Sequence, residues 1–142
     1  MYKPIHAFRL ALVTFACLAA LGAYAQSAVG SWSGHVDFSG AKGKDAKEQK
    51  SIDQMKQMFG SATIKLTMSA NKTYHIVFPP VGGMKGQTED GKWTQKGNAV
   101  TFIDPKAHKE TATLSSDGRT MVLLPPKEDP GPKGIKVVLK RS

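Results

Sequence analysis

The sequence predicts an all-β protein, an antiparallel up-and-down barrel of about eight strands with one short amphipathic helix between the first two strands. Apolar and polar residues alternate in short segments from residue 30 to residue 139, turn residues separate these segments, and only one segment has helical spacing. Short strands joined by turns at regular intervals are typical of sandwiches and barrels. Consecutive hairpins favour the up-and-down barrel, because closure leaves no strand edge exposed.

The first strand is expected at residues 30–38. Trp32, Gly34, Val36 and Phe38 fall on one face and polar residues on the other. Alternation with one apolar face is the pattern of a half-buried strand.

The helix is expected between a loop rich in Gly and Lys and Gly60. Asp45 with Glu48 has the spacing of a capping box, and Ser51 with Gln54 offers a second start. Gly60 is expected to end the helix at its C′ position, where left-handed backbone is common. Four residues recur at or beside helical spacing and form its apolar face: Ile52, Met55, Met58 and Phe59.

The remaining strands follow from alternation and from the turns between them. They are expected at 62–68, 73–78, around 92–94, and at 100–103, 111–115, 120–124 and 135–139. Asn71 tolerates left-handed backbone and predicts a turn before residue 73. Asp117-Gly118 is the strongest hairpin signal of the chain.

Residues 1–25 have the three zones of a secretory signal peptide. A basic start with Lys3 and Arg9 precedes an apolar run, and Ala23-Tyr24-Ala25 supplies small residues at a cleavage site. The apolar run is shorter than the about 20 residues of a transmembrane helix. Lipidation of Cys17 is the alternative, although Thr14 stands where a leucine-type residue is usual. We therefore expect an exported protein, periplasmic or extracellular, with the barrel domain at 26–142.

Cleavage after Ala25 changes the charge and the cysteine count. It removes Lys3 and Arg9, which lowers 20 basic side chains to 18 against 11 acidic ones, so that the net charge falls from +9 to +7. It also removes the single cysteine, Cys17, and with it every thiolate site. A positive net charge favours anionic partners. However, the lysines are dispersed and the aromatic residues lie at core-like positions, so no nucleic acid partner is expected.

No catalytic or metal-binding pattern stands out. Gly30 to Gly34 has Trp32 where a nucleophile elbow needs serine. His35 and His75 are expected on the polar faces of their strands rather than on a metal. Glu89-Asp90 and Glu128-Asp129 are expected to be solvated acidic pairs in loops, without the unequal environments of an acid and a base. We therefore expect neither enzymatic activity nor a metal or cofactor.

Short motifs carry a resemblance to a known family. Gly30-Ser31-Trp32 resembles the Gly-x-Trp signature of lipocalins and of small bacterial lipocalin-like secreted domains, and the segments 66–74 and 91–102 are similar to the hairpins of those domains. The resemblance spans most of residues 29–140 and implies a barrel whose closed end is plugged by Trp32. The helix after the first strand departs from lipocalins proper and is found in their intracellular lipid-binding relatives.

The expected function is binding of a small apolar or amphiphilic ligand inside the barrel by a monomer. Two groups of side chains are expected to line the pocket: Met55, Met58 and Phe59 from the helix, as a lid, and Ile64, Leu66, Tyr74, Ile76 and Phe102 from the strands. Nearby lysines are expected to attract an acidic head group. The alternative is an envelope interaction module or inhibitor with a filled barrel plugged by the helix, which binds partners through its loops, above all residues 125–133.

Overall fold

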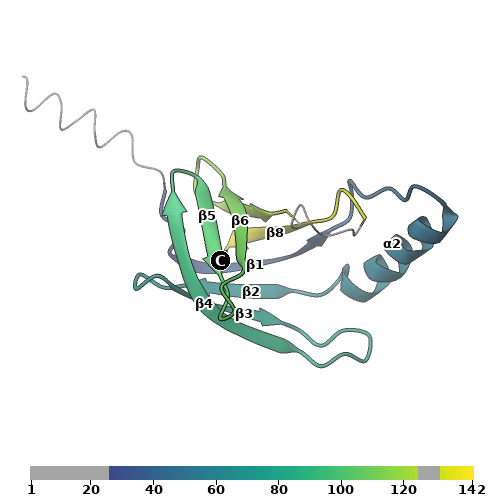
Figure 1. The fold of residues 1–142 in the computed structure, drawn as a ribbon, viewed down its shortest axis with the longest axis horizontal. Coiled ribbons are helices and arrows are strands. Elements are labelled where there is room, and N and C mark those ends of the chain that lie inside the picture. The colour runs from purple at the N-terminus through teal and green to yellow at the C-terminus, as the bar shows by residue number, and fades with distance from the viewer. Residues whose placement is uncertain (1–25, 125–131) are drawn as a thin grey trace, which may run out of the picture.

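The computed structural model describes residues 26–124 and 132–142, which form a closed barrel of eight antiparallel strands with one helix between the first two (Figure 1). The predicted fold class is therefore confirmed. The predicted signal peptide lies outside the described residues. The elements are β1 (Gly30–Asp37), α2 (Ala46–Phe59), β2 (Ile64–Met68), β3 (Thr73–Phe78), β4 (Gln87–Lys96), β5 (Ala99–Ile103), β6 (Lys109–Leu114), β7 (Thr120–Leu123) and β8 (Lys136–Arg141).

The strands pair in sequence order, and β8 pairs back with β1 to close the barrel. In this closing pair Trp32 lies opposite Arg141 and Gly34 lies opposite Leu139. Alternate side chains of each strand point inward and form one apolar core, because successive residues of a strand face opposite sides of a sheet. The core is made of Ala28, Trp32, Ile64, Leu66, Met68, Tyr74, Trp93, Val100, Phe102, Ala112, Leu114, Met121 and Leu139.

One end of the barrel is closed by Trp32 and the segment that precedes β1. The Trp32 side chain is 1% exposed, and its Nε1–H donates a hydrogen bond of 3.0 Å to the carbonyl oxygen of Ala28. The Arg141 guanidinium lies over the Trp32 ring at 4.3 Å and donates through Nη1 to the carbonyl oxygen of Val29. This end also carries the β2–β3, β4–β5 and β6–β7 turns.

The β2–β3 turn differs in detail from its sequence prediction. Lys72, not Asn71, takes the left-handed backbone, with φ of 68°. The Asn71 side chain instead accepts a hydrogen bond of 3.1 Å from the N–H of Thr73. The Lys72 ammonium then lies 4.1 Å from the centre of the Trp93 ring, whose indole N–H donates to the carbonyl oxygens of Ser69 and Thr73.

Helix α2 begins at the first of its two predicted starts. Asp45 is the N-cap and accepts a hydrogen bond of 2.8 Å from the N–H of Glu48. The Glu48 carboxylate in turn accepts a hydrogen bond of 2.7 Å from the N–H of Lys44. The predicted end at Gly60 is confirmed, although Gly60 is the C-cap and does not adopt the left-handed backbone that is common at C′. Gly60 has φ of −64° and its N–H bonds to the carbonyl oxygen of Lys56, so the backbone simply continues the last turn.

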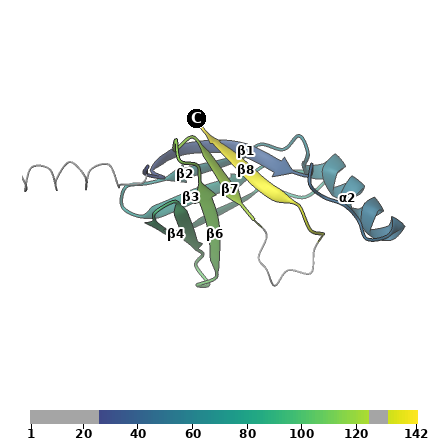
Figure 2. The same cartoon turned by 90° about the horizontal axis from the view of Figure 1, so that it is seen from above.

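Helix α2 projects from the end of the barrel opposite the Trp32 end (Figures 1 and 2). Ile52 is the one buried residue of α2, at 2% exposure, while Met55, Met58 and Phe59 are half-buried. Among the described residues no helix is long and apolar enough to cross a membrane.

Strand β4 begins five residues earlier than its apolar pattern suggests. Backbone pairing with β3 extends it to Gln87, which lies opposite Phe78, and it places Glu89 opposite Ile76. The prediction that Glu89 and Asp90 lie in a loop is therefore wrong. Consequently, Glu89 shares the inner face of the sheet with Ile76, and Asp90 faces outward beside His75.

Candidate functional site

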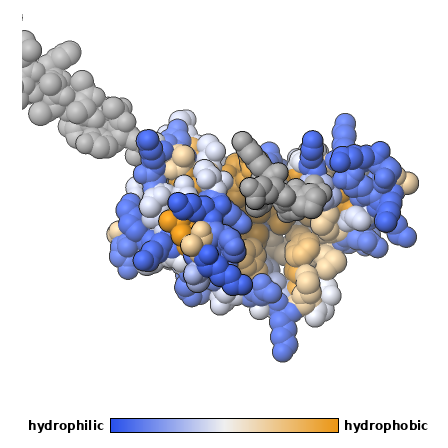
Figure 3. All heavy atoms as spheres, in the orientation of Figure 1, coloured by the Kyte–Doolittle hydropathy of each residue, from blue (hydrophilic) through white to orange (hydrophobic). Residues whose placement is uncertain are grey.

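A cavity of about 330 Å³ lies inside the barrel at the end that carries α2. Its wall is mainly apolar and comes from the seven strands β2 to β8 and from the segments that follow β5 and β7. The apolar side chains are Ile64, Leu66, Tyr74, Ile76, Phe78, Phe102, Leu123, Leu124, Ile135, Val137 and Leu139. Figure 3 shows apolar atoms in the hollow of this face, with hydrophilic side chains around it. Leu124, which is 64% exposed, marks the mouth.

The structure places five of the eight predicted lining residues around this cavity: Ile64, Leu66, Tyr74, Ile76 and Phe102. They come from β2, β3 and β5, and their alternation sets them on the inner face. Six further apolar side chains of the lining were missed: Phe78, Leu123, Leu124, Ile135, Val137 and Leu139. The alternation in the last two strands, which the sequence does show, is the signal that could have found Leu123, Val137 and Leu139.

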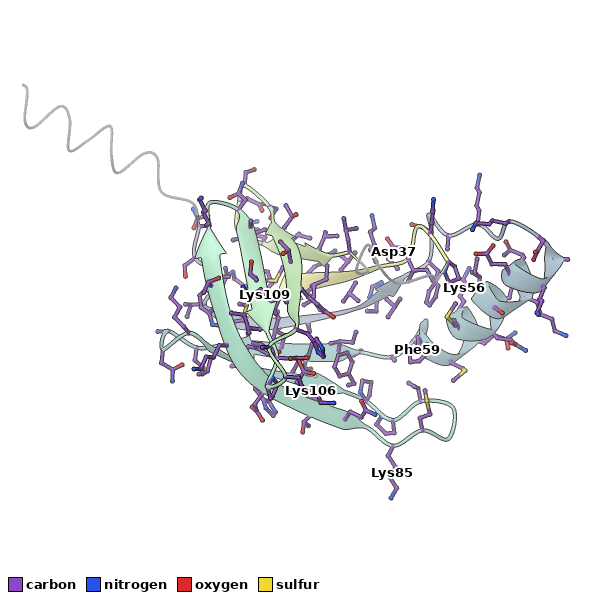
Figure 4. The ribbon with its side chains drawn as sticks, in the orientation of Figure 1. Asp37, Lys56, Phe59, Lys85, Lys106 and Lys109 are labelled. Carbon is purple, nitrogen blue, oxygen red and sulfur yellow. The ribbon has the colours of Figure 1, made fainter. Side chains whose placement is uncertain are left out.

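The three predicted residues of the helix, Met55, Met58 and Phe59, do not belong to the lining. The Met58 side chain instead lies against Gly82, where its Cε would be 3.0 Å from an added Cβ. Helix α2 thus packs against the loop between β3 and β4. Figure 4 shows Phe59 at the end of α2 nearest the barrel and Lys85 pointing away from the same loop.

Tyr74 contributes both an aromatic ring and a hydroxyl group to the wall of the cavity. Its ring meets Phe102 edge to face, with ring centres 5.2 Å apart and planes at 85°. Its hydroxyl donates a hydrogen bond of 2.6 Å to Oε1 of Glu89. Burial raises the pKa of the Tyr74 hydroxyl far above its ordinary value, and the hydrogen bond to Glu89 and the negative charges of Asp104 and Glu110 act in the same direction. Tyr74 therefore stays a neutral hydrogen-bond donor.

Gly91 makes room for the Tyr74 ring. A Cβ on Gly91 would lie 2.6 Å from two ring carbons of Tyr74 and 2.5 Å from the carbonyl oxygen of Ile103. Since Tyr74 and Gly91 are opposite each other in the β3–β4 pair, the missing side chain lets the ring lie across the neighbouring strand, with its hydroxyl at Glu89.

Replacing Gly91 with alanine is expected to displace the Tyr74 ring and lower the free energy of unfolding by about 1–3 kcal/mol, the range for overpacking. Urea denaturation measures this loss. Lys92→Ala, on the exposed neighbouring position, is the control and should change stability by no more than about 0.5 kcal/mol. Equal stability of Gly91→Ala and the unaltered protein would show that the ring is not held at this position.

The remaining lining residues are polar and include three carboxylates. Glu89, Asp104 and Glu110 line the cavity together with His108 and Lys136. Glu110 lies opposite Phe102 in the β5–β6 pair, so its side chain adjoins the apolar wall. This composition differs from the expectation that lysines surround the ligand, because Lys136 is the only lysine of the lining among the residues that the structure describes.

Asp104 organises the turn between β5 and β6. Its carboxylate accepts hydrogen bonds of 2.8 Å from the N–H groups of Lys106 and His108, and Nδ1 of His108 lies 2.9 Å away. Desolvation opposes ionisation of Asp104, but the bonds from His108 and Lys106 outweigh it and hold the pKa of the carboxyl below its ordinary value. The turn also places Ala107 at a φ of 66°. Asp104 is therefore an ionised, hydrogen-bonded part of the cavity edge.

The histidines do not come together. His35 is exposed on β1, His75 pairs with Asp90 outside the barrel at 2.6 Å, and His108 is at the cavity edge. Within residues 26–124 and 132–142, no three His, Cys, Asp or Glu side chains have the arrangement of a metal site. Of the loop proposed as an alternative binding surface, residues 125–131 lie outside the part of the chain that is described.

The arrangement suits noncovalent binding. An apolar wall can bury a hydrocarbon or aromatic group, while the carboxylates and the Tyr74 hydroxyl can form hydrogen bonds at one side of it. Comparison of the chain with family models, with curated proteins and with solved structures finds no match.

Proposed function

We propose that this chain is an exported, lipocalin-like binding protein that holds a small apolar or amphiphilic ligand inside its barrel. The observation that carries the proposal is the cavity of about 330 Å³ with eleven apolar or aromatic side chains in its wall. This volume falls in the range of about 300–1,000 Å³ that is usual for sites of small molecules. Export is supported by the signal-peptide pattern of residues 1–25, and the family by the Gly-x-Trp motif at Trp32.

Burial of ligand surface would supply the affinity. Each Å² of apolar surface removed from water contributes about 25 cal/mol, which must exceed the cost of immobilising the ligand. Eight paired strands hold the wall in place before the ligand enters, so little of the gain is lost in ordering the protein. A preformed cavity that is open at one end of the barrel therefore suits a carrier.

Native mass spectrometry of the gently purified chain is the direct test, together with titration of a fluorescent apolar probe. A bound small molecule at one copy per chain, or saturable probe binding that apolar compounds reverse, is the expected result. The proposal fails if the protein carries no adduct and the probe does not bind.

Filling the cavity should abolish binding. Leu123 lines the cavity, whereas its neighbour Val122 lies on the other face of β7. Leu123→Trp is expected to weaken probe binding by at least about tenfold, because the indole occupies the space of the ligand, with a tenfold change corresponding to about 1.4 kcal/mol.

Val122→Trp is the matched control, since it adds the same side chain to the same strand on the outside. It should leave probe affinity within about twofold of the unaltered protein. Circular dichroism should show a folded barrel for both variants. Equal loss of binding in both variants, or in neither, would contradict the location of the site.

A further inference from the structure

The cavity edge has the opposite charge to the protein around it. The whole chain has a net charge of +9, yet the lining formed by residues 26–124 and 132–142 has three carboxylates, one lysine and one histidine. A ligand that responded only to the overall charge would be anionic. At close range, however, the nearest charges decide, because Coulomb interactions are strongest over a few Å and salt screens those beyond about 10 Å.

The two basic side chains of the lining already have acidic partners. Nζ of Lys136 lies 3.7 Å from Oδ2 of Asp37, and Nδ1 of His108 lies 2.9 Å from Oδ2 of Asp104. Asp37 is outside the lining, so that Lys136 is drawn toward the neighbouring strand β1. Each basic group of the lining therefore already faces a carboxylate that offsets its charge.

Two of the carboxylates, by contrast, have no cationic partner in the described parts of the chain. No Lys, Arg or His nitrogen there lies within 4.0 Å of Glu89 or Glu110. The lysines nearest to Glu110 in sequence are Lys109 and Lys106, which are labelled in Figure 4. Lys109 precedes Glu110 on β6 and so faces the other side of the sheet.

The carboxylates also line the same cavity as the Tyr74 hydroxyl. Glu89 accepts the hydrogen bond of Tyr74 through Oε1 alone, at 2.6 Å, which leaves Oε2 for a ligand. Asp104 and Glu110 are close enough to Tyr74 for their charges to hinder its ionisation. The aromatic rings of Tyr74 and Phe102 lie in the same region, and aromatic faces attract cations as well.

We propose that the ligand is a cationic amphiphile, with an apolar body against the wall of the barrel and a protonated amine or similar cation at the carboxylates of Glu89 and Glu110, which line the cavity and are exposed. This inference rests on the proposed function, since it assigns the head group of the ligand that the cavity holds. Glu89 and Glu110 are the residues that determine specificity.

The test compares three ligands that share one alkyl chain: decylamine, decanol and decanoate. At pH 7 the amine is protonated, because alkylammonium groups resemble lysine, with a pKa of about 10.4. Decylamine is expected to displace the apolar probe at about tenfold lower concentration than decanol, as one charge-assisted hydrogen bond provides. Decanoate is expected to be the weakest of the three. Leu123→Trp, whose cavity is filled, measures any binding of these amphiphiles to the surface.

Two substitutions test whether Glu89 and Glu110 cause the preference for the amine. Glu89→Gln and Glu110→Gln each keep the shape of the side chain and remove its charge. Each substitution is expected to weaken the binding of decylamine by about tenfold and to leave the affinity for decanol unchanged. Asp90→Asn is the matched control, because Asp90 follows Glu89 on β4 but pairs with His75 outside the barrel. It should not alter the preference for the amine.

The outcomes separate the two proposals. If decanol binds to the unaltered protein and decylamine binds no better, or if decanoate binds best, the cationic head group is refuted and the cavity remains a ligand site. If the probe binds but none of the three displaces it, the cationic amphiphile is also refuted, whereas the absence of both an adduct and probe binding overturns the carrier function itself. A preference that survives in both glutamine variants would refute the role of Glu89 and Glu110.

Discussion

Replacing Gly34 with alanine is expected to lower the free energy of unfolding by about 3 kcal/mol or more, at the upper end of what overpacking causes. A Cβ at this position would lie 1.8 Å from the carbonyl oxygen of Val138 and 2.8 Å from the Cα of Leu139. Both contacts are with backbone, so no side-chain rotation can relieve them. The strands must move apart.

The position of Gly34 makes this movement costly. Gly34 lies in the middle of the β1–β8 pair, which closes the barrel. Separation of these strands would break inter-strand hydrogen bonds and expose the edges of an open sheet. Chemical denaturation measures the loss, and a fall in the m-value would indicate that the native barrel has opened.

His35→Ala is the control for Gly34→Ala. His35 follows Gly34 on β1 but is exposed on the outer face. Its replacement should change stability by no more than about 0.5 kcal/mol. If Gly34→Ala is as stable as His35→Ala, the close approach of β1 and β8 at this point is wrong.

The barrel was predictable because the sequence features that determine it, strand alternation and turn residues, lie within short segments of the chain. Strand alternation identifies the inner face of each segment, and turn residues such as Asp117-Gly118 identify the hairpins. The Asp117 carboxylate does accept bonds from Ser115 and Arg119, and Gly118 has φ of 71°. Since every strand pairs with its neighbour along the chain, no long-range choice of partner remained except the closure of β8 on β1.

The cavity was predictable only in part, because its edge depends on contacts distant in sequence. Ile64, Leu66, Tyr74, Ile76 and Phe102 follow from alternation alone. Glu89 does not, since Gln87 to Gly91 have no apolar alternation and are held in β4 by backbone bonds to β3.

The helix shows the same limit. Its amphipathic pattern predicts that one face is covered, but not what covers it. The loop between β3 and β4 has positive φ at both Gly82 and Gly83, and this bend brings Gly82 against Met58. A sequence pattern within residues 46–59 contains no information about that loop. It therefore cannot show that Met58 packs against the loop rather than lining the cavity.

Replacing Trp32 with alanine is the second substitution with a large expected effect, a loss of about 3–5 kcal/mol in the free energy of unfolding. The ring is 1% exposed, its N–H bonds to Ala28, and the Arg141 guanidinium lies over its face. Its removal would leave a void at the closed end and unpair the Ala28 carbonyl. It would also remove the surface on which Arg141 rests while that side chain bonds to Ser27, Val29 and Gly118.

Trp32→Phe separates these contributions. Phenylalanine keeps most of the buried ring but cannot donate the hydrogen bond to Ala28, so a smaller loss of about 1–3 kcal/mol is expected. Trp32 is not part of the cavity lining. The folded fraction of Trp32→Phe, measured well below its melting temperature, should therefore bind the apolar probe with unchanged affinity. A variant that stayed fully stable but lost probe binding would instead place Trp32 in the ligand site and refute its role as the plug of the closed end.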